Sequence, residues 1–153
     1  MVKPWSKNLA MLGLGGSIGT KSNGITAKVI AVSNFEELAN RSNEVKGKIV
    51  LFNVPFDTYS NTVKYRVRGA IEASKHGAVA SLVRSVGTFS MNTPHTGNSS
   101  YEDGVKKIPH AAITIEDAAM IGRMLENGQD VEVNLKMEAQ NYPDVLSHNV
   151  VGE

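Results

Sequence analysis

The sequence predicts a single α/β (α+β) domain, a mixed β-sheet with two or three flanking helices. Two apolar runs, residues 48–53 and 79–86, enclose a segment whose apolar residues recur at helical spacing. A strand joined to the next strand through a helix favours a parallel, right-handed crossover, so this pair should lie inside a sheet. Other strand-like and helix-like segments precede and follow it, and 153 residues suffice to bury one core without disulfides.

The first strand is predicted at residues 25–32, which include several β-branched residues and follow an Asn-Gly turn signal. Ser33 and, three residues later, Glu36 form a capping-box signature for a helix start. A short helix with Leu38 on its apolar face should follow and end near Arg41.

The central unit begins with an apolar strand at residues 48–53, which Pro55 ends. The helix predicted over residues 61–76 carries its apolar residues on one face, and Gly77 stands where a left-handed C-terminal cap is expected. Residues 79–86 then form the second apolar strand. This helix is the best supported of the predicted helices.

The second half of the chain opens with a polar loop at residues 87–109, which is rich in Gly, Asn, Ser and Pro. Its length indicates either a functional or a mobile segment. Residues 111–114 predict a short strand, and Thr114 caps a helix that ends near Asn127. Apolar and polar residues alternate over 131–137, which predicts a final strand with one polar face.

We divide the chain into a connector at residues 1–23, the folded domain at residues 24–139, and a linker with a truncated strand at residues 140–153. The last boundary rests on the turn-like sequence Gln-Asn-Tyr-Pro-Asp after Ala139. The truncated strand is expected to begin near residue 147.

Composition argues against several classes of protein. Lys plus Arg (16) nearly balances Asp plus Glu (15), so the charge implies neither a nucleic acid nor an acidic membrane as partner. No apolar run approaches the ~20 residues of a membrane span, and the first residues lack the pattern of a signal peptide. The absence of cysteine excludes disulfides and thiolate metal sites but leaves the cellular compartment open.

The glycine-rich run at residues 13–19 invites a nucleotide-binding interpretation, because glycines let backbone amides approach a phosphate. Ile18 stands where the dinucleotide fingerprint requires its third glycine, and a turn signal follows where a phosphate loop requires a helix. The same turn argues against Ser17 as the nucleophile of a Gly-x-Ser-x-Gly elbow. We therefore interpret the run as a flexible connector, with nucleotide binding as a remote alternative.

No catalytic or metal-ligating residue is assigned in this chain. The four histidines, His76, His95, His110 and His148, are scattered and lack the i, i+4 spacing of a zinc site. Adjacent acidic pairs fall mainly in first helical turns, where they complement the helix dipole.

A contact surface is the interpretation that the remaining residues favour. Aromatic and cationic side chains in or near loops have the composition of binding surfaces, although core packing explains many such residues equally well. The candidates are Tyr59, Tyr65, Arg66, His95 and Tyr101. Two Asn-x-Ser sequons, at Asn40 and Asn98, are possible glycosylation sites if the chain is secreted.

The chain also resembles a known family of domains. Residues 46–86 and 107–118 resemble a protease-associated domain, whose pattern is Gly-Lys-Ile-Val, a helix ending in Gly-Ala, an apolar strand, Ile-Pro and a capped helix. Further motifs resemble the plasma glutamate carboxypeptidase family of zinc exopeptidases over nearly the whole chain. They lie at residues 12–20, 65–73, 84–86, 94–97 and 135–137.

The resemblance implies a protease-associated domain with an open-barrel sheet, inserted into a secreted or lysosomal carboxypeptidase or dipeptidase with two zinc ions. The family's zinc ligands and catalytic glutamate lie outside this sequence, so no cofactor is expected on the chain itself. Its implied partners are the catalytic peptidase domain of the same polypeptide and a peptide or dipeptide substrate, and a homodimeric parent is one option.

The expected role is that of a lid or substrate-access module. Residues 59–66 and 87–109 should face the catalytic cleft, and the entry at residues 13–20 should lie close to the exit at residues 142–143. A free-standing domain that binds a protein or peptide is the alternative.

Overall fold

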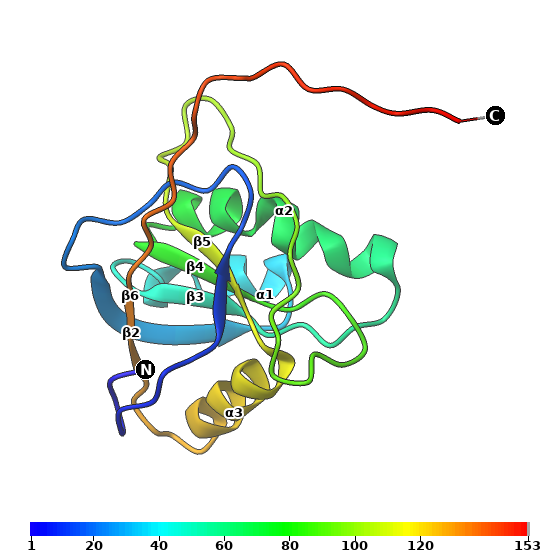
Figure 1. The fold of residues 1–153 in the computed structure, drawn as a ribbon. Helices are drawn as coiled ribbons and strands as arrows, with labels where there is room; N and C mark the ends of the chain where they lie inside the picture. The colour runs from blue at the N-terminus through cyan, green and yellow to red at the C-terminus, as the bar shows by residue number, and fades with distance from the viewer. Residues whose placement is uncertain (153) are drawn as a thin grey trace.

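The computed structural model describes residues 1–152 and arranges them as one six-stranded sheet with three α-helices (Figure 1). The strand order is β1-β5-β4-β3-β2-β6. This architecture confirms the predicted mixed sheet with flanking helices. The elements are β1 (Met11–Gly13), β2 (Ile25–Val32), α1 (Phe35–Asn40), a short 3₁₀ helix (Ser42–Glu44), β3 (Ile49–Phe52), α2 (Tyr59–Lys75), β4 (Ala80–Arg84), β5 (His110–Ile113), α3 (Ile115–Glu126) and β6 (Glu132–Leu135).

The centre of the sheet is parallel, as the two apolar runs predict. β3 and β4 are neighbours, with Ile49 opposite Ala80 and Phe52 opposite Val83. β2 joins β3 and β5 joins β4, also in parallel, whereas β1 and β6 pair antiparallel at the two edges. The predicted crossover from one strand through α2 to the next is therefore confirmed.

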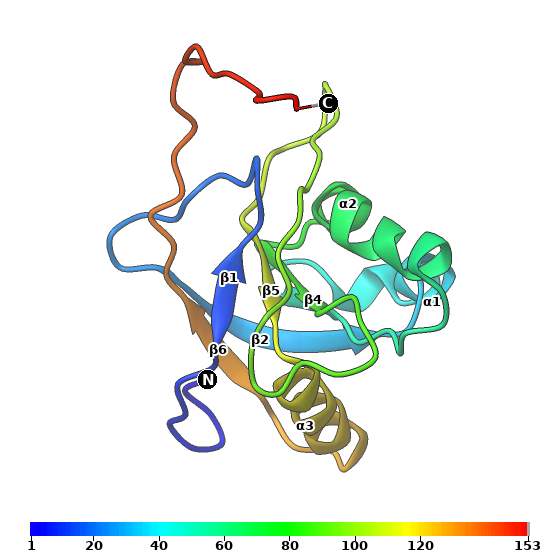
Figure 2. The same ribbon diagram turned by 45° about the vertical axis from the view of Figure 1, so that its right-hand side comes forward.

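The sheet curls because β2 belongs to two strand pairs. Its first half, from Ile25 to Lys28, pairs with β6, and its second half, from Val29 to Val32, pairs with β3. The strand bends between these halves and carries β6 out of the plane of the parallel strands (Figure 2). The expected open barrel is thus a half-barrel.

Alternation along the strands divides the core into two layers. Val50 and Phe52 point to the face that α1 and α2 cover, whereas Ile49 and Leu51 point to the face that α3 covers. All four side chains are fully buried. Each such burial contributes about 1.5–3 kcal/mol, which explains why the apolar runs of the sequence locate this sheet so well.

The start of α1 differs by one residue from the prediction. Asn34, not Ser33, is the N-cap, and its Oδ1 accepts a hydrogen bond from the Glu37 amide at 2.7 Å. The Glu37 carboxylate in turn accepts a hydrogen bond from the Ser33 amide at 2.7 Å. The predicted partner Glu36 is exposed. Two overlapping pairs, Ser33 with Glu36 and Asn34 with Glu37, have the spacing of a capping box, and the spacing alone does not select between them.

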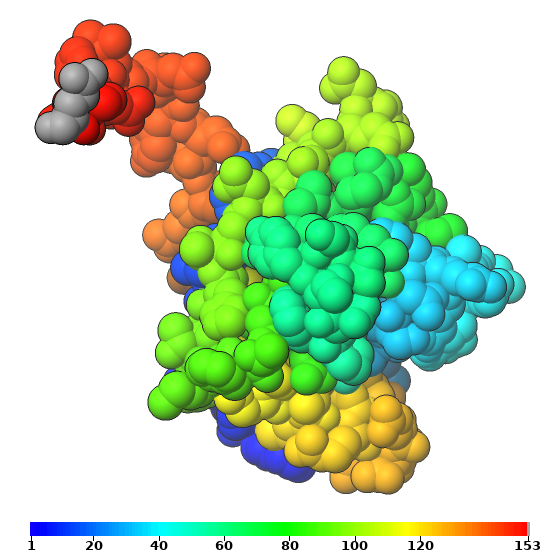
Figure 3. Space-filling model, turned by 90° about the vertical axis from the view of Figure 1, so that its right-hand side faces the viewer, coloured from blue at the N-terminus to red at the C-terminus, as the bar shows by residue number. Residues whose placement is uncertain are grey.

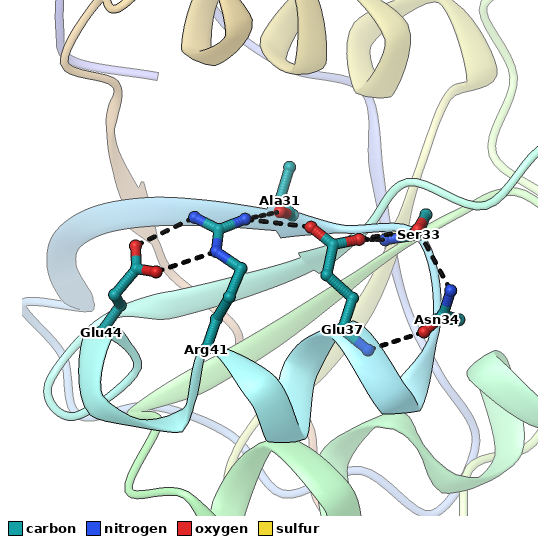
Figure 4. A network of polar contacts seen from close by, with 6 residues as sticks. All are labelled: Ala31, Ser33, Asn34, Glu37, Arg41 and Glu44. Carbon is teal, nitrogen blue, oxygen red and sulfur yellow. Dashed lines mark hydrogen bonds and ion pairs between the residues drawn. The ribbon is translucent and has the colours of Figure 1, made fainter.

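Side chains of α1 and the turn after it take the place of a neighbouring strand along β2 where β6 does not reach (Figure 4). Arg41 donates to the backbone oxygen of Ala31 at 3.0 Å and forms ion pairs with Glu37 at 3.1 Å and Glu44 at 3.0 Å. Glu37 in turn accepts from Ser33. The network satisfies backbone groups that would otherwise offer an edge for strand pairing.

Residues 11–13 form an edge strand that the sequence analysis did not predict. They pair antiparallel with β5, and Leu14 is buried directly after them. The Oγ of Ser17 accepts a hydrogen bond from the His110 amide at 2.9 Å. The interpretation of residues 13–19 as a flexible connector is therefore wrong at the start of this run. The sequence did not indicate the strand, because three residues are too few to show periodicity. No helix follows this run before Phe35 in residues 1–152, which excludes the nucleotide-binding fingerprint.

The segment after β6 extends away from the domain, and its described residues have no regular secondary structure. The strand expected near residue 147 does not form in the described part of the segment, where Val150 and Val151 are almost fully exposed, and Glu153 lies outside the described residues. Before this segment departs, the Thr20 amide donates to the Met137 oxygen at 2.8 Å, so entry and exit segments run side by side at this point. The division at residues 1–23, 24–139 and 140–153 remains a prediction.

The helices of residues 1–152 give no candidate for a membrane span, since each is too short or too polar.

Candidate contact site at the carboxyl edge of the sheet

The carboxyl ends of the parallel strands β3, β4 and β5 lie along one edge of the sheet. The loop over residues 85–109 starts there after β4, and α2 starts after the segment that leaves β3. Thr58 caps α2, because its Oγ1 accepts from the Asn61 amide at 3.3 Å. This is the edge at which open α/β sheets bind their ligands.

Arg66 ties the start of α2 to this loop. Its guanidinium donates to the Tyr59 hydroxyl at 2.7 Å and to the Thr96 backbone oxygen at 3.2 Å. The cation also lies 5.6 Å from the centre of the Tyr59 ring, within the range of a cation–π interaction. Figure 3 shows the two segments side by side on one face of the molecule. We call Tyr59, Arg66 and Thr96 the arginine clamp.

The guanidinium of the clamp is buried without a negatively charged partner. Arg66 is 8% exposed, its Nε has no hydrogen-bond acceptor, and no carboxylate of residues 1–152 forms an ion pair with it. Gly97 lies against the cation so closely that an added Cβ would stand 2.3 Å from Cζ. A residue with a side chain at this position would force either the loop or the Arg66 guanidinium to move.

His95 closes the stem of the same loop. Its amide donates to the Ser85 Oγ at 2.9 Å, and that hydroxyl donates to the Ile113 oxygen at 2.8 Å. The ring Nδ1 lies 3.0 Å from the Val86 oxygen. Because a carbonyl oxygen only accepts, Nδ1 must carry a proton, and in the neutral ring Nε2 is then an acceptor.

The other two contact candidates lie away from this edge. Tyr65 is 6% exposed and belongs to the core, where its ring centre is 4.7 Å from that of Phe35. Tyr101 donates to the Ile108 oxygen at 2.7 Å and accepts from the Ile18 amide at 3.0 Å, which fastens the second half of the loop to the entry segment. The structure thus brings together Tyr59, Arg66 and His95 and separates Tyr65 and Tyr101 from them.

Two large apolar side chains at the tip of the loop extend the candidate surface. Phe89 is 67% exposed and Met91 is 79% exposed, and Tyr59 at the start of α2 is 57% exposed. Phe89 was not among the predicted contact residues. An aromatic residue between Gly87-Thr88 and Ser90, in a polar loop, is the signal that could have found it.

A second cation lies at the end of β4. The Nη1 of Arg84 lies 3.4 Å from the Asn53 Oδ1, a long contact, and its Nε has no acceptor. Burial lowers the pKa of the Arg84 guanidinium, whereas the nearby Glu116 carboxylate opposes this shift. The carboxyl edge therefore carries the buried cation of Arg66 and the partly buried cation of Arg84, neither of which forms an ion pair within residues 1–152.

A groove of about 520 Å³ beside β2 is lined by the network of Figure 4 and by α3. Its lining includes Arg41 and Glu37, which already bond each other and the edge of β2. The network is explained by the open edge of β2, which it covers.

The histidines lie in different parts of the fold. His110 is buried in β5, His76 ends α2, His95 is in the loop and His148 is in the exposed terminal segment. Within residues 1–152, no three His, Asp or Glu side chains form a group that could hold a metal ion. Of the sequon residues, Asn40 is exposed at the end of α1, and Asn98 is exposed but lies against Gly15.

Comparison with known sequences gives relatives over the whole chain. No protein-family model matches. Carboxypeptidase Q of Homo sapiens is 53% identical, that of Xenopus laevis 56% and that of Mus musculus 52%, each over 153 residues. The chain spans about a third of the length of these relatives, 32% for the human protein and 33% for the other two.

Comparison with solved structures agrees. A peptidase M28 precursor from Shewanella amazonensis superposes with a TM-score of 0.83 and 33% identity over 89% of this chain and 32% of that chain. A zinc aminopeptidase from Bacillus subtilis superposes with a TM-score of 0.62 and 23% identity, over 87% of this chain and 28% of that chain. The second likeness shows the fold alone.

Proposed function

Since the whole chain is homologous to one third of carboxypeptidase Q, we propose that it is the protease-associated domain of a zinc-dependent carboxypeptidase or dipeptidase. In this proposal the domain is not catalytic and shapes substrate access to an active site on the rest of the polypeptide. The observation that carries it is 52–56% identity over all 153 residues, to relatives of which the chain covers only 32–33%.

The fold supports this proposal. A curled mixed sheet with three helices also describes the matching segment of the M28 peptidase relative. That segment likewise covers only 32% of its own chain. A domain that recurs with this fold inside a longer peptidase is expected to work together with the remaining two thirds.

The chemistry of peptide hydrolysis suggests which part of the parent polypeptide does what. Two zinc ions in the rest of the parent would supply an activated water, with a carboxylate there as general base. The residues of this chain would position and enclose the substrate. The arginine clamp holds Tyr59 and the loop backbone at Thr96 in fixed relation, so that the carboxyl edge presents one rigid surface.

The location of the parent is part of the same proposal. A secreted or lysosomal peptidase would pass through the compartment in which Asn-x-Ser sequons receive glycans. Asn40 is exposed on α1 and accessible to such a modification. A shift in mass of the secreted polypeptide that disappears in Asn40→Gln would support this route.

Hydrolysis of dipeptides by the complete polypeptide, set against the chain of residues 1–153 alone, tests the proposal. Both are supplied with zinc, and bound metal is measured in each. We expect turnover and two zinc ions only in the complete polypeptide. Turnover by the chain alone would contradict a non-catalytic role, and peptide binding by the chain together with an inactive complete polypeptide would favour the free-standing interaction domain.

A further inference from the structure

The tip of the loop after β4 is a tight turn with an unusual residue at its centre. The Thr93 amide donates to the Ser90 oxygen at 2.8 Å, which closes the turn over Met91 and Asn92. Both central residues have left-handed backbones, with φ of 47° and 58°. Turns of this kind favour glycine, asparagine and aspartate, so a methionine here carries conformational strain.

Anchors on α3 hold the turn in place. The Ser90 hydroxyl donates to the Glu116 carboxylate and accepts from the Ile115 amide at 3.0 Å. Hydrogen bonds from Ser90, and then from backbone amides that include those of Asn92 and Met91, lower the pKa of the Glu116 carboxyl. These hydrogen bonds favour the charged form of the carboxylate that holds the turn against α3.

The anchors fix which side chains face solvent. Ser90 is 4% exposed and points inward, whereas Phe89 is 67% and Met91 is 79% exposed on either side of it. Contact with water does not favour either side chain, because both are large and apolar. At position 91, glycine would also relieve the backbone strain. A strained backbone that displays an apolar side chain is typical of a surface kept for contact.

We propose that Phe89 and Met91 form an apolar prong that docks on the peptidase portion of the same polypeptide. This inference rests on the proposed function. The peptidase portion is the expected binding partner because the relatives extend about twice this chain's length beyond the matched segment. The prong also belongs to the loop that the arginine clamp holds at the carboxyl edge. The fitting partner is an apolar depression, to which methionine adapts through its flexible thioether.

Oxidation of methionine by hydrogen peroxide, located by mass spectrometry, tests the prong. The thioether takes one oxygen atom from the peroxide, which is reduced to water, at a rate that follows exposure. In the chain of residues 1–153 alone, Met91 should oxidise at least about tenfold faster than the buried Met124 and Met137. In the complete polypeptide without substrate, the rate at Met91 should fall about fivefold or more, while Met124 and Met137 stay slow.

Equal rates at Met91 in the chain and in the complete polypeptide would overturn the proposal. Protection that appears only when a non-hydrolysable dipeptide is added would also overturn it, because the substrate would then be the occupant. Either result is compatible with hydrolysis by the complete polypeptide, so failure of the prong and failure of the proposed function are distinguishable.

A matched pair of variants checks the result without peroxide. Met91→Gly removes the side chain but suits the left-handed backbone, so the chain alone should melt at an unchanged or higher temperature. In the complete polypeptide, Met91→Gly and Phe89→Ser should each increase hydrogen exchange at the turn and in the peptidase portion that it contacts. Unchanged exchange in both variants would contradict docking.

Discussion

Arg66 is a buried cation whose bonding partners are all neutral. The Tyr59 hydroxyl and the Thr96 oxygen accept two charge-assisted hydrogen bonds, and the Tyr59 ring adds a cation–π contact. Such bonds are roughly twice as strong as neutral ones, which offsets part of the cost of removing the guanidinium from water. The loop at Thr96 therefore depends on the planar shape of arginine and on its charge.

Arg66→Lys should destabilise the chain by about 1–3 kcal/mol, because a lysine ammonium does not reach both acceptors in the same geometry. Urea unfolding measures this loss, and amide exchange at residues 95–97 should accelerate. Arg68→Lys on the same helix is the matched control, since Arg68 is 46% exposed and pairs with Glu72. Its effect should stay within about 0.5 kcal/mol. Equal effects of the two changes would refute the clamp.

His110 shows how burial makes stability depend on pH. The ring lies between the Ser81 oxygen at 3.1 Å and the Arg66 oxygen at 3.0 Å, and it is fully buried. Burial lowers the pKa of its imidazole to about 4, against the opposing effect of these carbonyls and that of Tyr65. The folded chain therefore keeps His110 neutral at pH values where the unfolded chain protonates it.

The sign of the pH dependence follows directly. Above pH 6.5 the ring is neutral in both states and contributes nothing; below it, the unfolded state gains a proton that the folded state refuses. The free energy of unfolding should fall by up to ~3 kcal/mol between pH 6.5 and about 4. His110→Gln should flatten this part of the curve, whereas His148→Gln in the exposed terminal segment should not. An unchanged slope in His110→Gln would disprove the assignment.

Among the elements, the apolar strands, the long helices and the alternating edge strand β6 were predictable, whereas the edge strand β1 was not. The strands β3 and β4 were predictable because burial on both faces makes their residues continuously apolar, and α2 because burial of one face imposes a helical period. β1 has three residues and no period of its own, so its pairing with β5 becomes visible only in three dimensions. The arginine clamp is equally hidden, because Thr96 lies 30 residues from Arg66 along the chain.

The register of the α1 cap is testable at the same scale. Asn34→Ala should cost about 1 kcal/mol, since it removes the acceptor for the Glu37 amide. Glu36→Ala, which removes the partner that the sequence pattern suggested, should stay within about 0.5 kcal/mol because Glu36 is exposed. Thermal unfolding of the two variants decides which residue is the N-cap. A larger loss in Glu36→Ala than in Asn34→Ala would restore the cap at Ser33.

At the scale of the whole molecule, the curl of the sheet sets the shape of the domain. It arises where β2 changes partners from β6 to β3, a property that no local pattern in residues 25–32 reveals. The motif resemblance nevertheless predicted the mixed, open-barrel sheet, because such motifs carry information on a whole fold that periodicity lacks. The candidate site was predicted only in part: the predicted contact residue Tyr65 is buried in the core, and the exposed Phe89 was not predicted.

The central claim is that the carboxyl edge of this domain shapes substrate access in a peptidase. The kinetic constants of the complete polypeptide for a set of dipeptides test it most directly, with alanine at Tyr59 and at His95, which lie at this edge, and with Lys28→Ala, at an exposed side chain of β2, as control. The account predicts that KM for at least some dipeptides rises in the edge variants, at unchanged zinc content, and stays constant in the control. Unchanged constants for every dipeptide would contradict it.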